Sequence, residues 1–235
     1  MFSENRTRPS WYLKGGYAIA LRIASARTTK DVDLSIADLR LTADALHSMV
    51  DEELSLDLAD GFAFEVGTSI LELDAEPAGG SRFAVSARMA GRPFVSFHLD
   101  IGVGDDLIEP TDMIEGQGWF DFAGLPRPLF RAISREQQFA EKLHAYTLLR
   151  TERENSRVKD LVDMVLLLNN GIDPQYLRES IRRTFAHRGT HLLPAELSSP
   201  PESWRIRYAD LAAEFSIDPD ASGAVHKIAK FLGEL

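Results

Sequence analysis

The hydrophobic pattern of this 235-residue chain changes once, near Pro128. Before that residue, short segments alternate apolar and polar residues and are separated by glycine and aspartate, which is typical of half-buried β-strands. After it, apolar residues recur at helical spacing. A run of strands followed by a run of helices predicts an α+β fold rather than a doubly wound sheet. We therefore expect two domains, at residues 1–128 and 129–235.

These patterns also predict the individual elements. Strands are expected at residues 11–14, 31–36, 62–73, 82–89 and 93–103, with a turn at residues 77–80 between two of them. Helices are expected at residues 17–26 and 42–51, the second with Thr42 as its N-cap. Beyond Pro128, helices are expected at residues 136–150, 157–169, 174–186, 201–215 and 222–232.

Composition narrows the class of protein. Hydrophobic residues make up 44% of the chain and charged residues 26%, as in soluble globular proteins. The absence of cysteine excludes disulfides, thiolate metal sites and cysteine nucleophiles. No apolar run approaches the ~20 residues of a membrane span, and the polar start lacks the apolar core of a signal peptide. We therefore expect a cytoplasmic protein.

The formal net charge of −10 argues against broad, nonspecific binding of nucleic acid, so any such contact must be local. The best candidate is a basic stretch formed by Arg178, Arg182, Arg183, His187 and Arg188. The alternative interpretation of this stretch is a solvated helix face. Zinc-hydrolase spacing, a nucleophile elbow, a Walker A loop and a complete dinucleotide-binding fingerprint are all absent from the sequence.

Two aspartates are the strongest chemical signal in the first half. In the segment D-V-D-L-S-I, alternation sends the apolar residues to the core and places Asp31, Asp33 and Ser35 together on the opposite face. Two neighbouring carboxylates repel each other, whereas a bound divalent cation offsets this repulsion and stabilises the pair. Mg²⁺ binds one or two carboxylates together with substrate phosphates and water. The alternative is a pair of solvated aspartates at a strand end.

Two further features extend this interpretation. Gly15 and Gly16 follow a short strand and precede a helix, where the backbone can approach phosphate oxygens and the helix N-terminus offers free N–H groups. A plain tight turn is the alternative for them. Asp100 lies on the polar face of the strand at residues 93–103. If that strand is next to the D-x-D strand, Asp100 can complete the metal site or act as a base.

Two predicted helices of the second half add a lysine and an ion pair. Lys142 lies beside an apolar stripe, so that its ammonium can reach triphosphate oxygens while its stem covers the core. The alternative is an exposed lysine paired with Gln138 or a nearby acid. Arg157 and Asp160 lie three residues apart on one helix face, where they can pair.

Five motifs in order carry a family resemblance. The segments K-G-G-Y-A-I-A-L-R, R-T-T-K-D-V-D-L, F-H-L-D-I, F-A-E-K-L-H-A and R-V-K-D-L-V-D together resemble the AbiEii-type nucleotidyltransferase toxins, which include the MenT-like toxins. These proteins belong to type IV-like toxin–antitoxin systems and to the DNA polymerase β-like superfamily. The resemblance covers nearly the whole chain. It implies a polymerase β-like core with a mixed sheet, followed by a helical domain that completes the active-site cleft.

The resemblance also implies residue roles. Asp31 and Asp33 would hold the metal, Mg²⁺ or Mn²⁺, and Lys142 and Asp160 would be the essential lysine and aspartate of the helical half. We place Lys14, Gly15, Gly16, Ser35 and Arg157 in nucleotide binding.

The resemblance implies transfer of nucleotides from a nucleoside triphosphate (NTP) to the 3′ acceptor end of tRNA, which stops translation and growth, and a cognate antitoxin as partner. Two alternatives stay open. One is nucleotidylation of a protein or small molecule; the other is a catalytically silent module that binds nucleotide and antitoxin.

Overall fold

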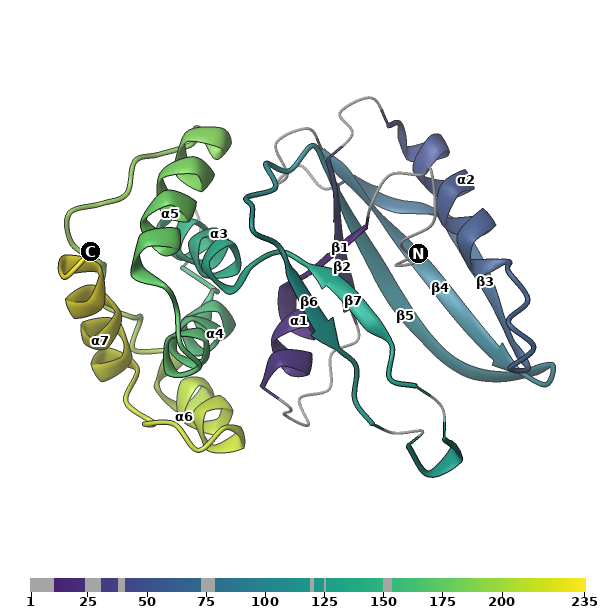
Figure 1. Ribbon diagram of the computed structural model, residues 1–235. Coiled ribbons are helices and arrows are strands. Elements are labelled where there is room, and N and C mark those ends of the chain that lie inside the picture. The colour runs from purple at the N-terminus through teal and green to yellow at the C-terminus, as the bar shows by residue number, and fades with distance from the viewer. Residues whose placement is uncertain are drawn as a thin grey trace. The chain divides into compact units, whose positions relative to one another are not determined.

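The computed structural model describes residues 11–23, 31–37, 41–72, 79–118, 121–124, 126–149 and 154–235 (Figure 1). Its strands are β1 (Tyr12–Lys14), β2 (Asp31–Ile36), β3 (Phe62–Glu72), β4 (Gly80–Met89), β5 (Arg92–Val103), β6 (Asp112–Glu115) and β7 (Leu129–Ala132). Its helices are α1 (Gly15–Arg22), α2 (Ala43–Leu54), α3 (Arg135–Thr147), α4 (Val158–Asn169), α5 (Pro174–Arg188), α6 (Trp204–Glu214) and α7 (Ala221–Gly233), with a short 3₁₀ turn at Asp121–Ala123.

The chain forms two compact units. The sheet unit comprises Met1–Leu21, Thr28–Leu107 and Met113–Ala132, and the helical unit comprises Arg22–Arg27, Ile108–Asp112 and Ile133–Leu235. Each unit therefore collects three separate segments of the chain. The two domains expected from the sequence, 1–128 and 129–235, stay a prediction.

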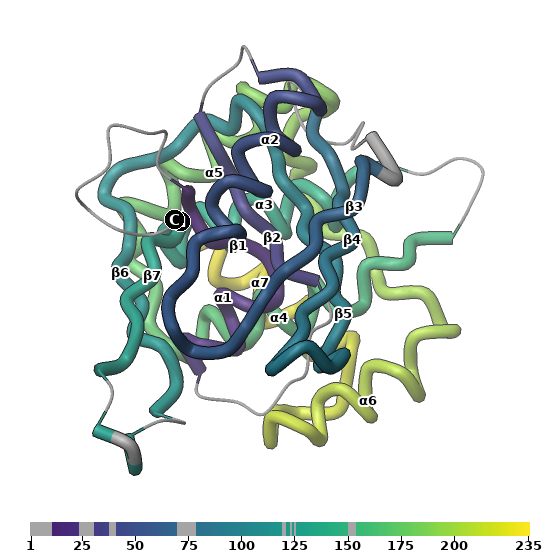
Figure 2. The backbone as a smooth tube through the Cα atoms, turned by 90° about the vertical axis from the view of Figure 1, so that its right-hand side faces the viewer, coloured from purple at the N-terminus to yellow at the C-terminus, as the bar shows by residue number. Residues whose placement is uncertain are grey.

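A seven-stranded mixed sheet has the order β3-β4-β5-β2-β1-β7-β6. Strands β3, β4 and β5 form an antiparallel meander, seen side by side in Figure 2. Strand β5 is parallel to β2, β2 is antiparallel to β1, and β1 is parallel to β7. The α+β fold with a mixed sheet is thereby confirmed.

The core of the sheet unit follows from the alternation of side chains along each strand. Leu34 and Ile36 of β2 are almost completely buried, as the pattern of that strand predicts. Phe83 of β4 and Ile101 of β5 are buried with them, and α2 adds Leu46. Burying each such side chain contributes about 1.5–3 kcal/mol. The opposite face of β2 and β5 is thus left for the polar residues.

Most predicted elements agree with the structure to within three residues. One difference concerns α1, which begins at Gly15 instead of residue 17, so that both glycines lie in its first turn. The stretch 24–26 at the expected end of that helix lies outside the described residues, as do Pro77 and Ala78 of the expected turn. Strands β6 and β7 were not predicted, because their four residues show too little alternation and no pair of glycines marks their ends, as Gly15 and Gly16 do for β1.

Helices α3 to α7 of the helical unit confirm the predicted helical half. Local signals set several of their ends. Asp173 caps α5 by accepting hydrogen bonds from the backbone N–H groups of Gln175 and Tyr176, and Pro174 occupies the first turn. Gly189 ends α5 in the left-handed conformation. Among the residues that the structure describes, no helix is long and apolar enough to span a bilayer.

Candidate active site

The D-x-D strand lies next to the strand that carries Asp100. In the parallel pairing of β2 with β5, Asp33 is opposite Asp100 and Asp31 is opposite His98. Residues opposite each other on neighbouring strands point to the same face. Asp31, Asp33 and Asp100 therefore share one face of the sheet, and the condition under which Asp100 could join the D-x-D pair, that the two strands are neighbours, is met.

Gly15 allows the backbone to approach the carboxylate of Asp33 closely. A Cβ at Gly15 would lie 1.9 Å from Asp33 Oδ2, far inside van der Waals contact. Gly15 also has φ +64°, a conformation that glycine adopts at no steric cost. Both the close contact with Asp33 and the positive φ therefore require glycine at position 15. Gly16 is the second residue of α1.

Asp100 is held by an arginine that sequence reasoning missed. Arg82 of β4 donates from Nε to Asp100 Oδ1 at 2.7 Å and from Nη2 to Asp100 Oδ2 at 2.6 Å. The hydrogen bonds and the charge of Asp100, followed by the nearby charges of Asp31 and Asp33, raise the pKa of the Arg82 guanidinium. Register places Arg82 directly opposite Asp100. Two opposite charges at matching polar positions of consecutive strands were the available signal.

Asp31 has a different neighbour. The ring nitrogen Nδ1 of His98 lies 3.1 Å from Asp31 Oδ1, and both side chains are 45% exposed. We call Asp31, Asp33 and Asp100, together with Arg82 and His98, the carboxylate cluster. It is partly open to solvent, so that a ligand can reach it.

Lys14 and Ser35 belong to a separate, buried group centred on Asp105. Lys14 Nζ lies 2.7 Å from Asp105 Oδ2, and the Ser35 hydroxyl donates to the same oxygen at 2.5 Å. All three residues are less than 7% exposed. Their contact with a nucleotide, predicted from the sequence, would have to compete with these bonds. Asp105 lies two residues after the end of β5, and its signal was the sequence G-D-D behind a predicted strand.

The helical unit holds a second charged group, which we call the lysine cluster: Lys142, Asp160 and Asp163. Lys142 Nζ lies 3.0 Å from Asp160 Oδ1 and 2.8 Å from Asp163 Oδ2. Burial alone lowers the pKa of Lys142, but the carboxylates of Asp163 and Asp160 outweigh it, so the pKa is raised above the usual lysine value. The ammonium is therefore charged. Lys142 is paired with acids, as in the alternative interpretation, but its side chain is only 12% exposed, whereas that interpretation expected an exposed lysine.

Arg157 extends the lysine cluster toward solvent. It precedes α4, and its Nη1 lies 3.5 Å from Asp160 Oδ2, which confirms the expected pair. Its side chain is 43% exposed, compared with 13% for Asp160. The role of Asp163 was missed, since an acid near the start of a helix is explained by the helix dipole alone.

The residues present fit a magnesium ion bound through few protein ligands. The described parts of the chain contain no group of three or more histidine, aspartate or glutamate side chains placed to enclose a metal. Mg²⁺, however, commonly binds one or two carboxylates and takes its other ligands from phosphates and water. Asp31 and Asp33, on one face of β2, supply such a pair.

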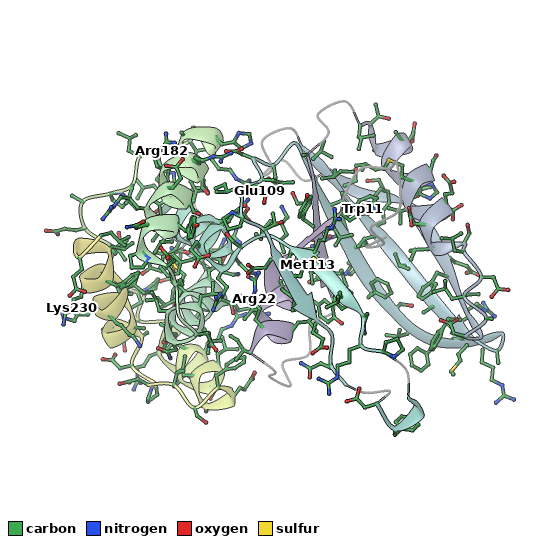
Figure 3. The ribbon with its side chains drawn as sticks, in the orientation of Figure 1. Trp11, Arg22, Glu109, Met113, Arg182 and Lys230 are labelled. Carbon is green, nitrogen blue, oxygen red and sulfur yellow. The ribbon has the colours of Figure 1, made fainter. Side chains whose placement is uncertain are left out.

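The basic stretch lies along α5. Arg182 points outward from this helix, as Figure 3 shows, and is 68% exposed. It donates to both carboxylate oxygens of Glu179, at 2.8 and 2.6 Å. Part of its charge is therefore balanced within the helix.

The comparisons with known proteins decide the family. A family model described as "Nucleotidyl transferase AbiEii toxin, Type IV TA system" matches residues 1–231. The chain belongs to this family. The expectation of a nucleotidyltransferase toxin of a toxin–antitoxin system is thereby confirmed. No curated protein matches the chain.

Solved structures were found in the comparisons, and one of them shows the fold. The nucleotidyltransferase toxin MenT4 from Mycobacterium tuberculosis H37Rv aligns with a TM-score of 0.60 at 19% identity, over 95% of this chain and 82% of that one. A putative nucleotidyltransferase from H. pylori aligns with a TM-score of 0.46 at 13% identity, over 94% of this chain and 84% of that one. The MenT4 match shows that this AbiEii-family chain has the fold of a MenT toxin.

Proposed function

We propose that this toxin transfers a nucleotide from an NTP to the 3′ acceptor end of tRNA and so blocks translation. The observation that carries the proposal is the pair Asp31 and Asp33 on the polar face of β2, with Gly15 packed against Asp33. Membership of the AbiEii family supports nucleotidyl transfer as the chemistry. A cognate antitoxin is the expected partner, since the family belongs to toxin–antitoxin systems.

In this proposal, Asp31 and Asp33 hold a divalent cation, Mg²⁺ or Mn²⁺. The bound cation would supply positive charge against the oxygens of the triphosphate. Gly15 and Gly16 lie in the first turn of α1, and a helix N-terminus is a favourable place for phosphate. Lys14 and Ser35 are proposed to assist nucleotide binding from the buried group around Asp105, where both contact the same carboxylate oxygen.

Lys142, Asp160 and Arg157 are proposed as the essential residues of the helical unit. The charged ammonium of Lys142 and the partly exposed guanidinium of Arg157 are suited to offset charge that develops on phosphate oxygens during in-line displacement. Asp160 contacts both cations and fixes their separation.

A protein acceptor is the second candidate. The net charge of −10 gives little electrostatic attraction for tRNA, which carries one negative charge per nucleotide. The chain would then nucleotidylate a protein, for example its partner.

The test is incubation of the purified protein with each of the four labelled NTPs, Mg²⁺ and total tRNA, followed by separation of RNA from protein. We expect label at the 3′ end of tRNA. Label on protein with unlabelled tRNA would favour the second candidate. The absence of label on either, from a folded protein, would contradict both.

A silent binding module makes a different prediction. If the protein acts without turnover, the Asp33→Ala variant still arrests growth of a bacterial host. We expect this variant to lose growth inhibition while keeping the fold, as checked by circular dichroism.

A further inference from the structure

The carboxylate cluster contains one cation that the proposed chemistry leaves without a role. Arg82 lies in a row of residues that are opposite one another across four strands: Arg82 on β4, Asp100 on β5, Asp33 on β2 and Lys14 on β1. All four side chains start on the same face of the sheet. The row begins and ends with a cation, and its two central members are the carboxylates.

The contact between Arg82 and Asp100 uses both oxygens of the carboxylate. The two hydrogen bonds, at 2.7 and 2.6 Å, form a parallel fork, which is the strongest arrangement for this pair of groups. Asp100 is the inner partner, with 12% of its side chain exposed, and Arg82 is the outer one, with 30% exposed. The less exposed Asp100 carboxylate therefore holds the more exposed guanidinium of Arg82 in place.

The guanidinium of Arg82 has N–H donors that Asp100 does not use. A guanidinium carries five N–H donors, of which two serve Asp100, so three are left on its other edges. Within the described part of the chain, Arg82 has no other hydrogen-bonding side-chain partner. A rigid, charged fork with free edges suits the oxygens of a phosphate chain.

A cation at Asp100 is disfavoured by the same geometry. A metal ion bound to either oxygen of Asp100 would lie against a guanidinium that already holds both oxygens, and like charges would repel. The contact with Arg82 thus gives Asp100 a task other than metal binding.

We propose that Arg82 binds the triphosphate of the NTP, that Asp100 is the positioning residue that holds Arg82, and that the cation is bound by Asp31 and Asp33 without Asp100. This inference rests on the proposed function, because it assumes that the cluster receives an NTP and a divalent cation. It assigns Asp100 a role different from the metal ligand or base predicted from the sequence.

The test measures binding of a non-transferable NTP analogue, methylene-bridged between the α and β phosphorus atoms, by calorimetry in EDTA and again in Mn²⁺. The ratio of the two dissociation constants is the metal-dependent gain. We expect Arg82→Gln to weaken binding in EDTA by about tenfold, the loss of a charge-assisted hydrogen bond. Arg88→Gln, on the same strand and 42% exposed, is the matched control and should change binding by less than about twofold.

The metal-dependent gain in analogue affinity distinguishes the role of Asp33 from that of Asp100. Asp33→Asn should lose the gain, and Asp100→Asn should keep it to within about threefold. In the Asp100→Asn background, Arg82→Gln should weaken binding by less than about threefold, because Arg82 is no longer held in place. If Arg82→Gln unfolds the protein, Arg82→Lys keeps the charge but not the fork and should weaken binding by about threefold.

Three results would overturn the inference: loss of the gain in Asp100→Asn, unchanged binding in both Arg82→Gln and Arg82→Lys, or an equal effect of Arg82→Gln in both backgrounds. These results differ from a failure of the proposed function. Normal analogue binding with no transfer to tRNA would contradict the acceptor alone. A wild-type protein that binds no analogue in either condition would contradict both.

Discussion

The carboxylate cluster of the sheet unit and the lysine cluster of the helical unit both combine acids with a cation, but their environments differ. Asp31 and His98 are 45% exposed, whereas Lys142 is 12% exposed and Asp163 only 2%. In the sheet unit, acids outnumber bases on a surface that solvent reaches. In the helical unit, a buried ammonium is satisfied by two carboxylates on one neighbouring helix.

The difference indicates what each cluster depends on. Exposed like charges on one strand face gain little from the fold and much from a ligand of opposite sign. A buried ion pair is part of the fold, since removal of one partner leaves an uncompensated charge in a low-dielectric environment. We therefore expect substitutions of Asp31 and Asp33 to affect activity alone, and substitutions in the lysine cluster to affect stability as well.

The largest effect is expected for Asp33→Asn. Loss of one of two proposed cation ligands should lower nucleotidyl transfer by about 10³-fold or more, the scale of a lost electrostatic contact in a transition state. Because asparagine keeps the shape of the side chain, the free energy of unfolding should stay within about 1 kcal/mol of wild type. Labelled-NTP transfer and thermal melting measure the two quantities. Asp51→Asn, at an exposed position of α2, is the control and should change neither.

Lys142→Met should lower the stability of the protein, an effect that distinguishes the lysine cluster from the carboxylate cluster. The change leaves Asp160 and Asp163 without their shared ammonium, so we expect a loss of about 3–5 kcal/mol in the free energy of unfolding. Urea denaturation followed by circular dichroism measures it. Lys159 is an exposed residue of α4, the helix that carries Asp160 and Asp163, and Lys159→Met should lower the free energy of unfolding by less than about 0.5 kcal/mol. Equal stability of the two variants would remove the contrast between the clusters.

Gly15→Ala tests the close approach between α1 and the D-x-D strand. A methyl group there would overlap Asp33 Oδ2, so the carboxylate must move, and we expect about a 100-fold loss of transfer activity. Gly61→Ala is a matched control, because Gly61 also has positive φ, at +77°, but has open space around it. It should share the backbone cost of about 1 kcal/mol and retain activity. Similar activity in both variants would show that the Asp33 contact is unimportant.

The smallest effect concerns pH in the helical unit. Burial, with the nearby His191 and Arg188, lowers the pKa of His144 to about 4, and its Nε2 lies 2.8 Å from the Thr190 hydroxyl. Between about pH 6.5 and 4 the imidazole is protonated only in the unfolded chain, so stability is full above pH 6.5 and falls as the pH drops toward 4.

From pH 7 to pH 5, the wild type should therefore lose about 1–2 kcal/mol more than His144→Gln, as measured by denaturation at each pH. His226→Gln, at an exposed position of α7, should follow the wild type. A wild-type loss equal to that of His144→Gln would show that this histidine titrates normally.

Sequence reasoning recovered the parts of the candidate site that depend on local patterns. Period-two alternation in D-V-D-L-S-I was sufficient to place Asp31 and Asp33 on one face of a strand, and the helical spacing of Arg157 and Asp160 predicted their pair. It missed Arg82, Asp105 and Asp163, since each acquires its role from a partner on another element. Strands β6 and β7 were missed for the related reason that pairing, rather than periodicity, defines such short strands.

The amino-acid sequence by itself determined the α+β order of elements, the family and the identity of the charged residues. These features follow from the periodicity of hydrophobic residues and from the order of the motifs, which are properties of the linear sequence. Only the tertiary structure decided that β5 is next to β2, that Asp100 is opposite both Asp33 and Arg82, and that Lys142 meets two acids from α4. These contacts join residues that are 18 or more positions apart. Their register depends on how the apolar faces pack together, which no local pattern records.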